Sequence, residues 1–380
     1  MFPTQFTSAS FTWERKKLGI YVPITMGQSP NSKNYTNNPR DNILVQGNAD
    51  LYNNRVLKRT FTTEVTKIAD RNDILISVRA PVGDIARNQY ESIVIGRGIA
   101  AIKGNNFLYY QLEKMNNSGF WKKYIAGSTF ESITGKDLKS SDIYISNHKE
   151  EKSIGDIFQT LTKTIQLHED HLQFLHSFKS FLLQKMFFDN DIPPLLRFNK
   201  FTEKWNQCRL NDHAIVTMGQ SPNSKNYTNN QTDKILVQGN ADLYKNKVLK
   251  RVFTTEITKT AVKNDILISV RAPVGDIARN QYESVVIGRG IASIKGNDFL
   301  YYQLEKMKNS GFWNKYIAGS TFESITGKDL KNAKIYTTNS DEERKISNIF
   351  SSLTKIIQLQ EHKIDSLKKL KQFLLQNMFI

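Results

Sequence analysis

The chain is a tandem duplication of one sequence. The fourteen residues TMGQSPNSKNYTNN occur at 25–38 and again at 217–230. The offset of 192 residues holds without a gap from Trp13 and Trp205 to Met186 and Met378. Two copies are too few for a solenoid, in which stacked neighbours stabilise each repeat. The 380 residues are therefore predicted to form two equivalent modules, each of ordinary domain size.

Each copy begins with mixed secondary structure and ends in one long helix. Short β-branched runs such as DILISV alternate with turn sequences, and FLYYQLEKM predicts a helix that a following glycine ends. Later in each copy, apolar residues recur at steps of three and four, which is typical of a coiled coil. The predicted seam comprises Ile154, Phe158, Leu161, Ile165, His168, Leu172, Leu175 and Leu182, then Ile346, Phe350, Leu353, Ile357, Gln360, Ile364, Leu367 and Leu374.

A metal site at the segment HEDH is not predicted. Its histidines, His168 and His171, are three residues apart, whereas the zincin pattern requires four. We expect His168 and its equivalent Gln360 to set the register of the coiled coil instead.

The predicted fold is α+β. Two similar mixed α/β domains are joined by two long antiparallel coiled-coil spacer helices, with pseudo-twofold symmetry, because neither helix can bury its apolar stripe alone. The Pro-Pro pair in NDIPPLLRF breaks the first helix. The predicted boundaries are 1–147 for the first domain, 148–189 for its helix, 190–196 for the linker, 197–339 for the second domain and 340–380 for its helix.

The charge of the chain favours a polyanionic partner such as nucleic acid. Lys and Arg outnumber Asp and Glu by 53 to 36, which gives a net charge of +17. No run of eighteen apolar residues and no signal sequence is found, so we expect a cytoplasmic protein without a membrane partner. The single cysteine, Cys208, agrees with a reducing compartment.

The duplicated loop offers groups that can contact DNA. Glutamine and asparagine can pair bidentately with adenine, and lysine can bind a phosphate or a guanine edge. The alternative is a solvated turn rich in Asn and Ser. The candidates are Gln28, Ser29, Asn31, Lys33, Asn34 and Tyr35, with the equivalents Gln220, Ser221, Asn223, Lys225, Asn226 and Tyr227.

Arginines and a later Lys-Ser-Thr segment are further candidates. Arg79 ends an apparent strand and Arg87 follows it, so both could bind guanine or phosphate, unless they pair with Asp73 or Asp84. IGRG lacks the third glycine of a nucleotide fingerprint and indicates close backbone packing with a phosphate-facing arginine. The candidates are Arg79, Arg87, Arg97, Lys123, Ser128 and Thr129, with the equivalents Arg271, Arg279, Arg289, Lys315, Ser320 and Thr321.

Three segments carry a family resemblance: LRFNKFTEKWNQCRL opens the second module, GSTFESITGKDL closes each globule, and LKKLKQFLLQNMF lies near the end. In this order the chain resembles the specificity (S) subunit of type I restriction-modification systems. The resemblance implies two target-recognition domains that each read one half of a bipartite site in double-stranded DNA. Family members commonly carry two unlike domains, whereas these two are nearly the same. We therefore predict an interrupted palindrome as the target.

The resemblance also implies partners. Two methylation subunits would carry S-adenosylmethionine, and motor-nuclease subunits would use ATP and Mg, with no cofactor on this chain and no catalysis by it. The sequence contains no NPPY or DPPY tetrapeptide and no Walker A loop. Two alternatives stay open: a self-contained DNA-modifying enzyme, and an RNA-binding scaffold that stacks bases on Phe107, Tyr109 and Tyr110.

Overall fold

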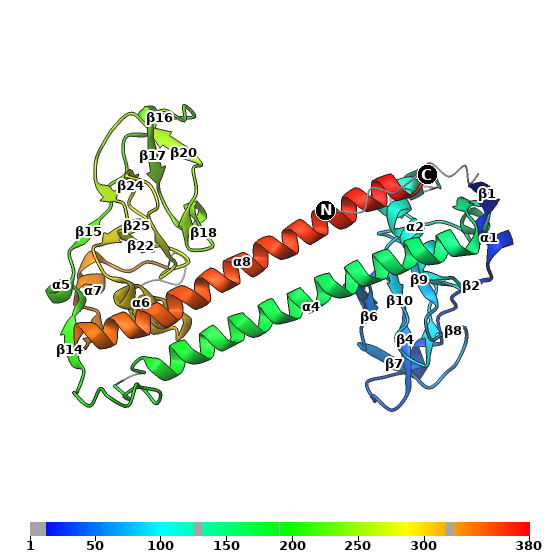
Figure 1. Cartoon of the computed structure of the whole chain (residues 1–380), viewed down its shortest axis with the longest axis horizontal. Coiled ribbons are helices and arrows are strands. Elements are labelled where there is room, and N and C mark those ends of the chain that lie inside the picture. Colours follow the sequence, from blue (N-terminus) through cyan, green and yellow to red (C-terminus); the bar gives the residue numbers. More distant parts are fainter. Residues whose placement is uncertain (1–12, 125–130, 190, 317–322) are drawn as a thin grey trace. The chain divides into compact units, whose positions relative to one another are not determined.

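A computed structural model of the chain describes residues 13–124, 131–189, 191–316 and 323–380 (Figure 1). The chain divides into two compact units that do not follow the order of the copies. Unit 1 comprises residues 1–169 and 362–380, and unit 2 comprises residues 170–361. Each unit therefore combines one globule with the first part of its own long helix and the last part of the other copy's helix.

The described strands of unit 1 form a two-stranded ribbon and two larger mixed sheets. The ribbon pairs β1 (Glu14–Lys17) with β13 (Asp142–Ile145). One sheet has the spatial order β2 (Ile24–Met26), β12 (Ile99–Ile102), β9 (Ile74–Ser77), β10 (Ile85–Arg87), β6 (Arg55–Val56) and β5 (Leu51–Tyr52). The other has the order β3 (Tyr35–Thr36), β7 (Thr60–Thr62), β4 (Asn42–Val45), β11 (Ser92–Ile95) and β8 (Ile68–Asp70).

Unit 2 repeats this topology. Its ribbon pairs β14 (Asn206–Arg209) with β26 (Lys334–Thr337). One sheet has the order β15 (Val216–Met218), β25 (Ile291–Ile294), β22 (Ile266–Ser269), β23 (Ile277–Arg279), β19 (Lys247–Val248) and β18 (Leu243–Tyr244). The other has the order β16 (Tyr227–Thr228), β20 (Val252–Thr254), β17 (Lys234–Val237), β24 (Ser284–Ile287) and β21 (Thr260–Val262).

Short helices close the loops of both globules. In unit 1 they are α1 (Leu18–Tyr21), α3 (Gly135–Ser140) and the 3-10 helices η1 (Ser32–Asn34), η2 (Asn48–Asp50) and η3 (Phe120–Tyr124). Their equivalents in unit 2 are α5 (Leu210–His213), α7 (Gly327–Asn332), η4 (Ser224–Asn226), η5 (Asn240–Asp242) and η6 (Phe312–Tyr316).

Strand β9 is apolar along most of its length because both of its faces are buried. Ile74 and Ile76 belong to the cluster that contains helix α2 (Asn106–Asn117), whereas Leu75 belongs to the cluster between the two larger sheets. Successive side chains of a strand point to opposite faces, so a strand between two cores needs apolar residues at consecutive positions. The run DILIS therefore marks the central strand of the globule.

The predicted helix FLYYQLEKM is confirmed as α2, and its equivalent is α6 (Asp298–Asn309). The side chain of Asn105 caps the start of α2, and Gly119 follows its end with a φ of +72°. A positive φ is readily adopted by glycine, which explains this helix stop.

The RNA-stacking hypothesis is wrong for the aromatic residues on which it rested. Phe107, Tyr109 and Tyr110 are 1%, 3% and 4% exposed and lie in the core of unit 1. A base could not reach these rings without unfolding α2 from the globule.

The long helices are α4 (His148–Met186) and α8 (Ser340–Met378), and each ends on the globule of the other copy. In unit 2, Phe187 follows α4 and is 1% exposed. Its ring lies 5.2 Å from Phe299, 5.7 Å from Phe350 and 6.3 Å from Trp205 between centroids. Unit 1 repeats the cluster with Phe379 against Phe107, Phe158 and Trp13, at 5.2, 5.5 and 6.2 Å.

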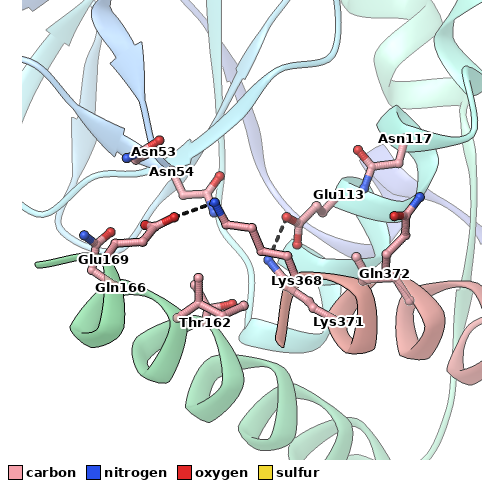
Figure 2. Close-up of a pocket in the computed structure, with 12 residues that line it drawn as sticks. Asn53, Asn54, Glu113, Asn117, Thr162, Gln166, Glu169, Lys368, Lys371 and Gln372 are labelled. Carbon is pink, nitrogen blue, oxygen red and sulfur yellow. Dashed lines mark hydrogen bonds and ion pairs between the residues drawn. The ribbon is translucent and has the colours of Figure 1, made fainter. Parts of the chain in front are cut away.

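Ion pairs fasten each helix end to the same globule. Lys179 Nζ lies 2.7 Å from Glu305 Oε1 on α6 in unit 2, and Lys371 Nζ lies 2.8 Å from Glu113 Oε1 on α2 in unit 1. None of these four side chains is more than 17% exposed. In unit 1 the pair lines a cavity of about 500 Å³ between α2, α4, α8 and the hairpin tip at Asn54 (Figure 2). Removing one partner of such a buried pair strands a charge, which is strongly destabilising.

Most of the predicted seam is buried, in three separate places. The first turns of both helices pack into the globule cores through Ile154, Phe158, Ile346 and Phe350. Within unit 2, the antiparallel segments of α4 and α8 share a separate cluster. It comprises Leu175, Leu353 and Ile357, with Leu172 and Leu182 packed against it.

At the ends of the helices the buried face is wider than the predicted seam. Leu182 and Leu374 are half-buried and pack against apolar clusters, and the next residues, Leu183 and Leu375, are 2% and 4% exposed. These ends pack against a globule as well as a helix, so the buried face includes one more residue. The helices begin at the predicted residues 148 and 340 but end at 186 and 378, before the predicted 189 and 380.

His168, Gln360 and Ile165 lie on the half-buried or buried side of the helices, as do Leu161, Ile364 and Leu367. Within the described ranges, no group of three His, Cys, Asp or Glu side chains could hold a metal ion. No helix in the described part of the chain has an apolar stretch of the length that crossing a bilayer requires.

The end of α4 packs on the globule of unit 2, so truncating Phe187 should destabilise unit 2 and not unit 1. Phe187→Ala should destabilise unit 2 by about 3–5 kcal/mol, because it removes a fully buried ring from the core. Hydrogen exchange of α6 with increasing urea measures this loss, and α2 in unit 1 should keep its protection. Phe181→Ala is the matched control, since Phe181 lies on the same helix and is 47% exposed. Equal losses in the two variants would contradict this packing.

Candidate nucleic-acid interface

One carboxylate holds the duplicated loop in each globule. The backbone N–H of Asn31 and the side-chain amide of Asn34 donate to Glu64 Oε2 at 2.8 and 2.6 Å. These two hydrogen bonds, the backbone one first, lower the pKa of Glu64. Glu256 holds Asn223 and Asn226 in the same way, at 2.8 and 2.7 Å. The loop is therefore fixed to the globule before any ligand binds.

Several predicted contact residues shape this loop from within. The Asn31 side chain caps η1 through the N–H of Lys33, and Ser29 Oγ accepts from the N–H of Arg97 at 3.1 Å. Both bonds recur in the second copy. The alternative interpretation, in which these side chains build a turn, therefore holds for Asn31 and Asn34. Gln28 and Lys33 are exposed at the surface.

The glycines of the loop and of IGRG allow three backbone segments to meet. A Cβ on Gly27 would lie 2.1 Å from the carbonyl oxygen of Gly96, and a Cβ on Gly98 would lie 2.3 Å from that of Gln46. Neither distance leaves room for a side chain. The close backbone packing predicted for IGRG is confirmed.

In unit 2 these segments line a concave surface of about 550 Å³. Arg271 and Arg289 are both exposed at this surface, and neither guanidinium has a hydrogen bond or ion pair within the described part of the chain. The lining comprises Ser221, Pro222, Asn223, Ser224 and Tyr227 from the loop, Gln238, Gly239 and Asn240 after β17, Arg271 and Ala272 after β22, and Arg289 and Gly290 before β25.

The alternative pairing of Arg79 with an aspartate is wrong. Asp73 accepts from Lys103 at 3.5 Å, and Asp84 accepts from the side chain of Asn116 at 3.1 Å. Arg79 is exposed, as is its equivalent Arg271. Both remain available to a ligand.

Arg87 is committed to the fold. Its guanidinium donates to the carbonyl oxygens of Asn72, Gly104 and Asn105 and lies 5.1 Å from the ring of Tyr109. Burial lowers the pKa of Arg87. Arg279 makes the corresponding contacts with Asn264, Gly296, Asp298 and Tyr301. This geometry corrects the prediction that Arg87 and Arg279 face DNA, because their donors are already satisfied within the globule.

Lys123 and Lys315 are exposed and lie over aromatic rings. Their Nζ atoms are 3.8 and 4.0 Å from the ring centroids of Phe120 and Phe312. A lysine held in this way keeps its charge at the surface, which suits a phosphate contact. The candidates Ser128, Thr129, Ser320 and Thr321 lie outside the described residues.

The structure adds two pairs of residues to the candidate surface. Gln238 and Asn240 line it, with Gln46 and Asn48 as their equivalents. Both belong to the repeated sequence ILVQGNADLY, and the glutamine directly follows a buried strand. In the sequence, the feature that could have identified these residues is a polar residue at a strand end next to a glycine.

Residues 11–176 and 202–369 each match the family described as "Type I restriction modification DNA specificity domain". The chain is 28% identical over 284 residues to a protein named putative type I restriction enzyme MjaX specificity subunit from Methanocaldococcus jannaschii, covering 70% of this chain and 65% of that one. It is 23% identical over 198 residues to the type I restriction enzyme MjaIX specificity subunit of the same organism, covering 48% and 45%. The aligned part is thus under two thirds of either relative's length.

Two solved structures share the fold. The S subunit of a type I restriction-modification system from M. genitalium aligns with a TM-score of 0.68 at 14% identity, over 99% of this chain and 98% of that one. A chain from a structure on complex assembly and conformational transition of the type I R-M system aligns with a TM-score of 0.61 at 19% identity, over 97% and 98%.

The duplicated α+β globules with spacer helices define a two-module DNA specificity protein. The chain belongs to the type I restriction-modification DNA specificity family, whose domain it contains twice.

Two arginines that lie close in the sequence should have different effects when truncated: one should affect stability and the other selectivity for the target DNA. Arg279→Ala should lower the free energy of unfolding of unit 2 by about 2 kcal/mol, because it removes charge-assisted hydrogen bonds to the carbonyl oxygens of Asn264 and Gly296. Arg271→Ala should leave stability unchanged and weaken selectivity for target over random DNA, measured by competition binding of the assembled complex. A loss of selectivity with Arg279→Ala at unchanged stability would reverse these roles.

Proposed function

We propose that this chain is the DNA specificity subunit of a type I restriction-modification complex, in which each globule reads one half of a bipartite duplex target. The concave surface carries the proposal, because an exposed arginine pair and a fixed polar loop meet there. A chain with a net charge of +17 suits a phosphate backbone. Family membership of both copies supports the assignment.

The two halves of the target should carry the same bases. The loop 25–38, the arginines at 79 and 97 and the glutamine at 46 recur unchanged in the second copy. The antiparallel helix pairing expected from the sequence would present these readers in opposite directions. Identical readers in opposite directions select an interrupted palindrome.

This predicts the methylation pattern of cells that carry the complex. Their methylome should contain one interrupted palindrome with a methylated adenine in each half. Single-molecule sequencing of genomic DNA, compared with a strain that lacks this chain, measures the motif. A motif with two unrelated halves would contradict the shared reading.

Exposed aromatic residues on the long helices suit the methylation subunits that the family relationship implies. In unit 2, Phe174, Phe178 and Phe181 are 63%, 42% and 47% exposed on one face of α4, and the first two rings stack at 6.0 Å. In unit 1, Leu370 and Phe373 of α8 occupy the positions equivalent to Phe178 and Phe181. Contiguous exposed apolar side chains of this kind mark protein-binding surfaces.

Polar substitution of this face should remove one methylation subunit. Phe174→Ser with Phe178→Ser should change the mass of the reconstituted complex by one subunit, because the equivalent surface in unit 1 stays intact. Mass photometry measures the stoichiometry, and Gln173→Ser, an exposed neighbour, is the control. Two bound methylation subunits at nanomolar concentration in the double variant would place the docking surface elsewhere.

We further propose that the chain itself is not catalytic and acts in the cytoplasm. Methylation would use S-adenosylmethionine held by the methylation subunits, and cleavage would use ATP and Mg held by motor-nuclease subunits. The chain supplies the sequence choice and the spacing between the two readers.

A further inference from the structure

A side chain that reads a base must be held rigidly and must still have a hydrogen-bonding group without a partner in the protein. Several residues at the concave surface do not meet the second condition. Asn223 caps η4, and Asn226 donates to Glu256. Ser221 accepts from the N–H of Arg289. These loop residues are occupied by the fold, and the exposed Gln220 does not belong to the lining of the concave surface, so the other amide side chains in that lining are those of Gln238 and Asn240.

The backbone of Gln238 is fixed on both sides. Its N–H donates to Asp242 Oδ2 at 2.8 Å, and its carbonyl oxygen accepts from the N–H of Gly290 at 3.1 Å. A Cβ on Gly290 would lie 2.3 Å from that carbonyl oxygen, so only glycine allows the contact. Asp242 is 6% exposed, which shields its carboxylate from competing water. The glutamine therefore projects from a rigid base, which a base-reading side chain requires.

A tyrosine orients the side chain of this glutamine. Tyr35 Oη donates to Gln46 Oε1 at 3.2 Å, whereas Tyr227 Oη lies within hydrogen-bond distance of two acceptors, the carbonyl oxygen of Pro222 at 3.3 Å and Gln238 Oε1 at 3.4 Å. The amide nitrogen of each glutamine then points away from the tyrosine. Among the described residues neither amide nitrogen has a hydrogen-bond partner, and Gln238 lines the concave surface.

We propose that Gln46 and Gln238 each read an adenine through the major groove, one in each half-site, with Tyr35 and Tyr227 as positioning residues. The free amide N–H donates to adenine N7, and the second lone pair of Oε1 accepts from adenine N6. Arginine cannot make this pair because it has no acceptor. The inference rests on the proposed function and adds to it the base and the side chain that reads it.

The duplication supplies an internal control for the test. The complex reconstituted with methylation subunits is used to select binding sites from duplexes randomised in both halves. The unaltered chain should select adenine at one equivalent position in each half. Gln238→Ala should lose that preference, by roughly 5- to 150-fold, in one half only, because Gln46 still reads the other. Gln238→Glu should shift the preference at that position towards cytosine, since a carboxylate only accepts and cytosine N4 donates.

Tyr227→Phe should weaken the adenine preference in the same half without changing the affinity for random DNA, as expected of a positioning residue. Gln231→Ala is the matched control, because Gln231 is an exposed glutamine of the same globule that does not belong to the lining of the concave surface. Retention of the adenine preference in Gln238→Ala, or its loss in Gln231→Ala, would overturn the assignment. Failure of the unaltered complex to select any bases would instead reject the proposed function.

Discussion

The core of each globule is completed by a phenylalanine from the other copy. Phe187 packs into unit 2 and Phe379 into unit 1, and a buried lysine-glutamate pair accompanies each ring. Burial of the ring supplies most of the free energy, whereas the ion pair penalises any other register by stranding a charge. A single copy, with one globule and one helix, therefore leaves two complementary surfaces open. The duplication allows one chain to fill both.

The concave surface is rigid because backbone segments pack closely against one another there. The close approaches at Gly27, Gly98 and their equivalents bring the loop, the strand end and the IGRG turn together without side chains between them. Buried carboxylates at Asp50 and Asp242 then satisfy backbone N–H groups. Arg271 and Arg289 stay exposed at this surface, and their guanidinium groups have no partner among the described residues. Selectivity can therefore come from a few side chains on a surface that does not need to rearrange.

The sequence predicts the large features of this fold because they depend on repetition and periodicity. The 192-residue offset, the helical steps of three and four and the apolar run at 74–77 each follow from simple geometry. Side-chain roles inside the loop and the globule were less predictable. Arg87 and Arg79 look alike in sequence, but only Arg87 meets three carbonyl oxygens from distant segments. Such contacts depend on tertiary structure, and so does the burial of Leu183 beside Leu182 at the helix end.

One difference between the copies lies where each globule meets the long helices. The hairpin tip carries Asn53 in unit 1 and Lys245 in unit 2, where Nζ lies 3.1 Å from Glu361 Oε1. The equivalent carboxylate in unit 1, Glu169, pairs instead with Lys368 of α8 at 2.5 Å (Figure 2). Partly exposed pairs of this kind contribute little to stability, so the change alters how a globule is attached more than how firmly it folds. The two units thus present the same ligand-facing groups on differently attached globules.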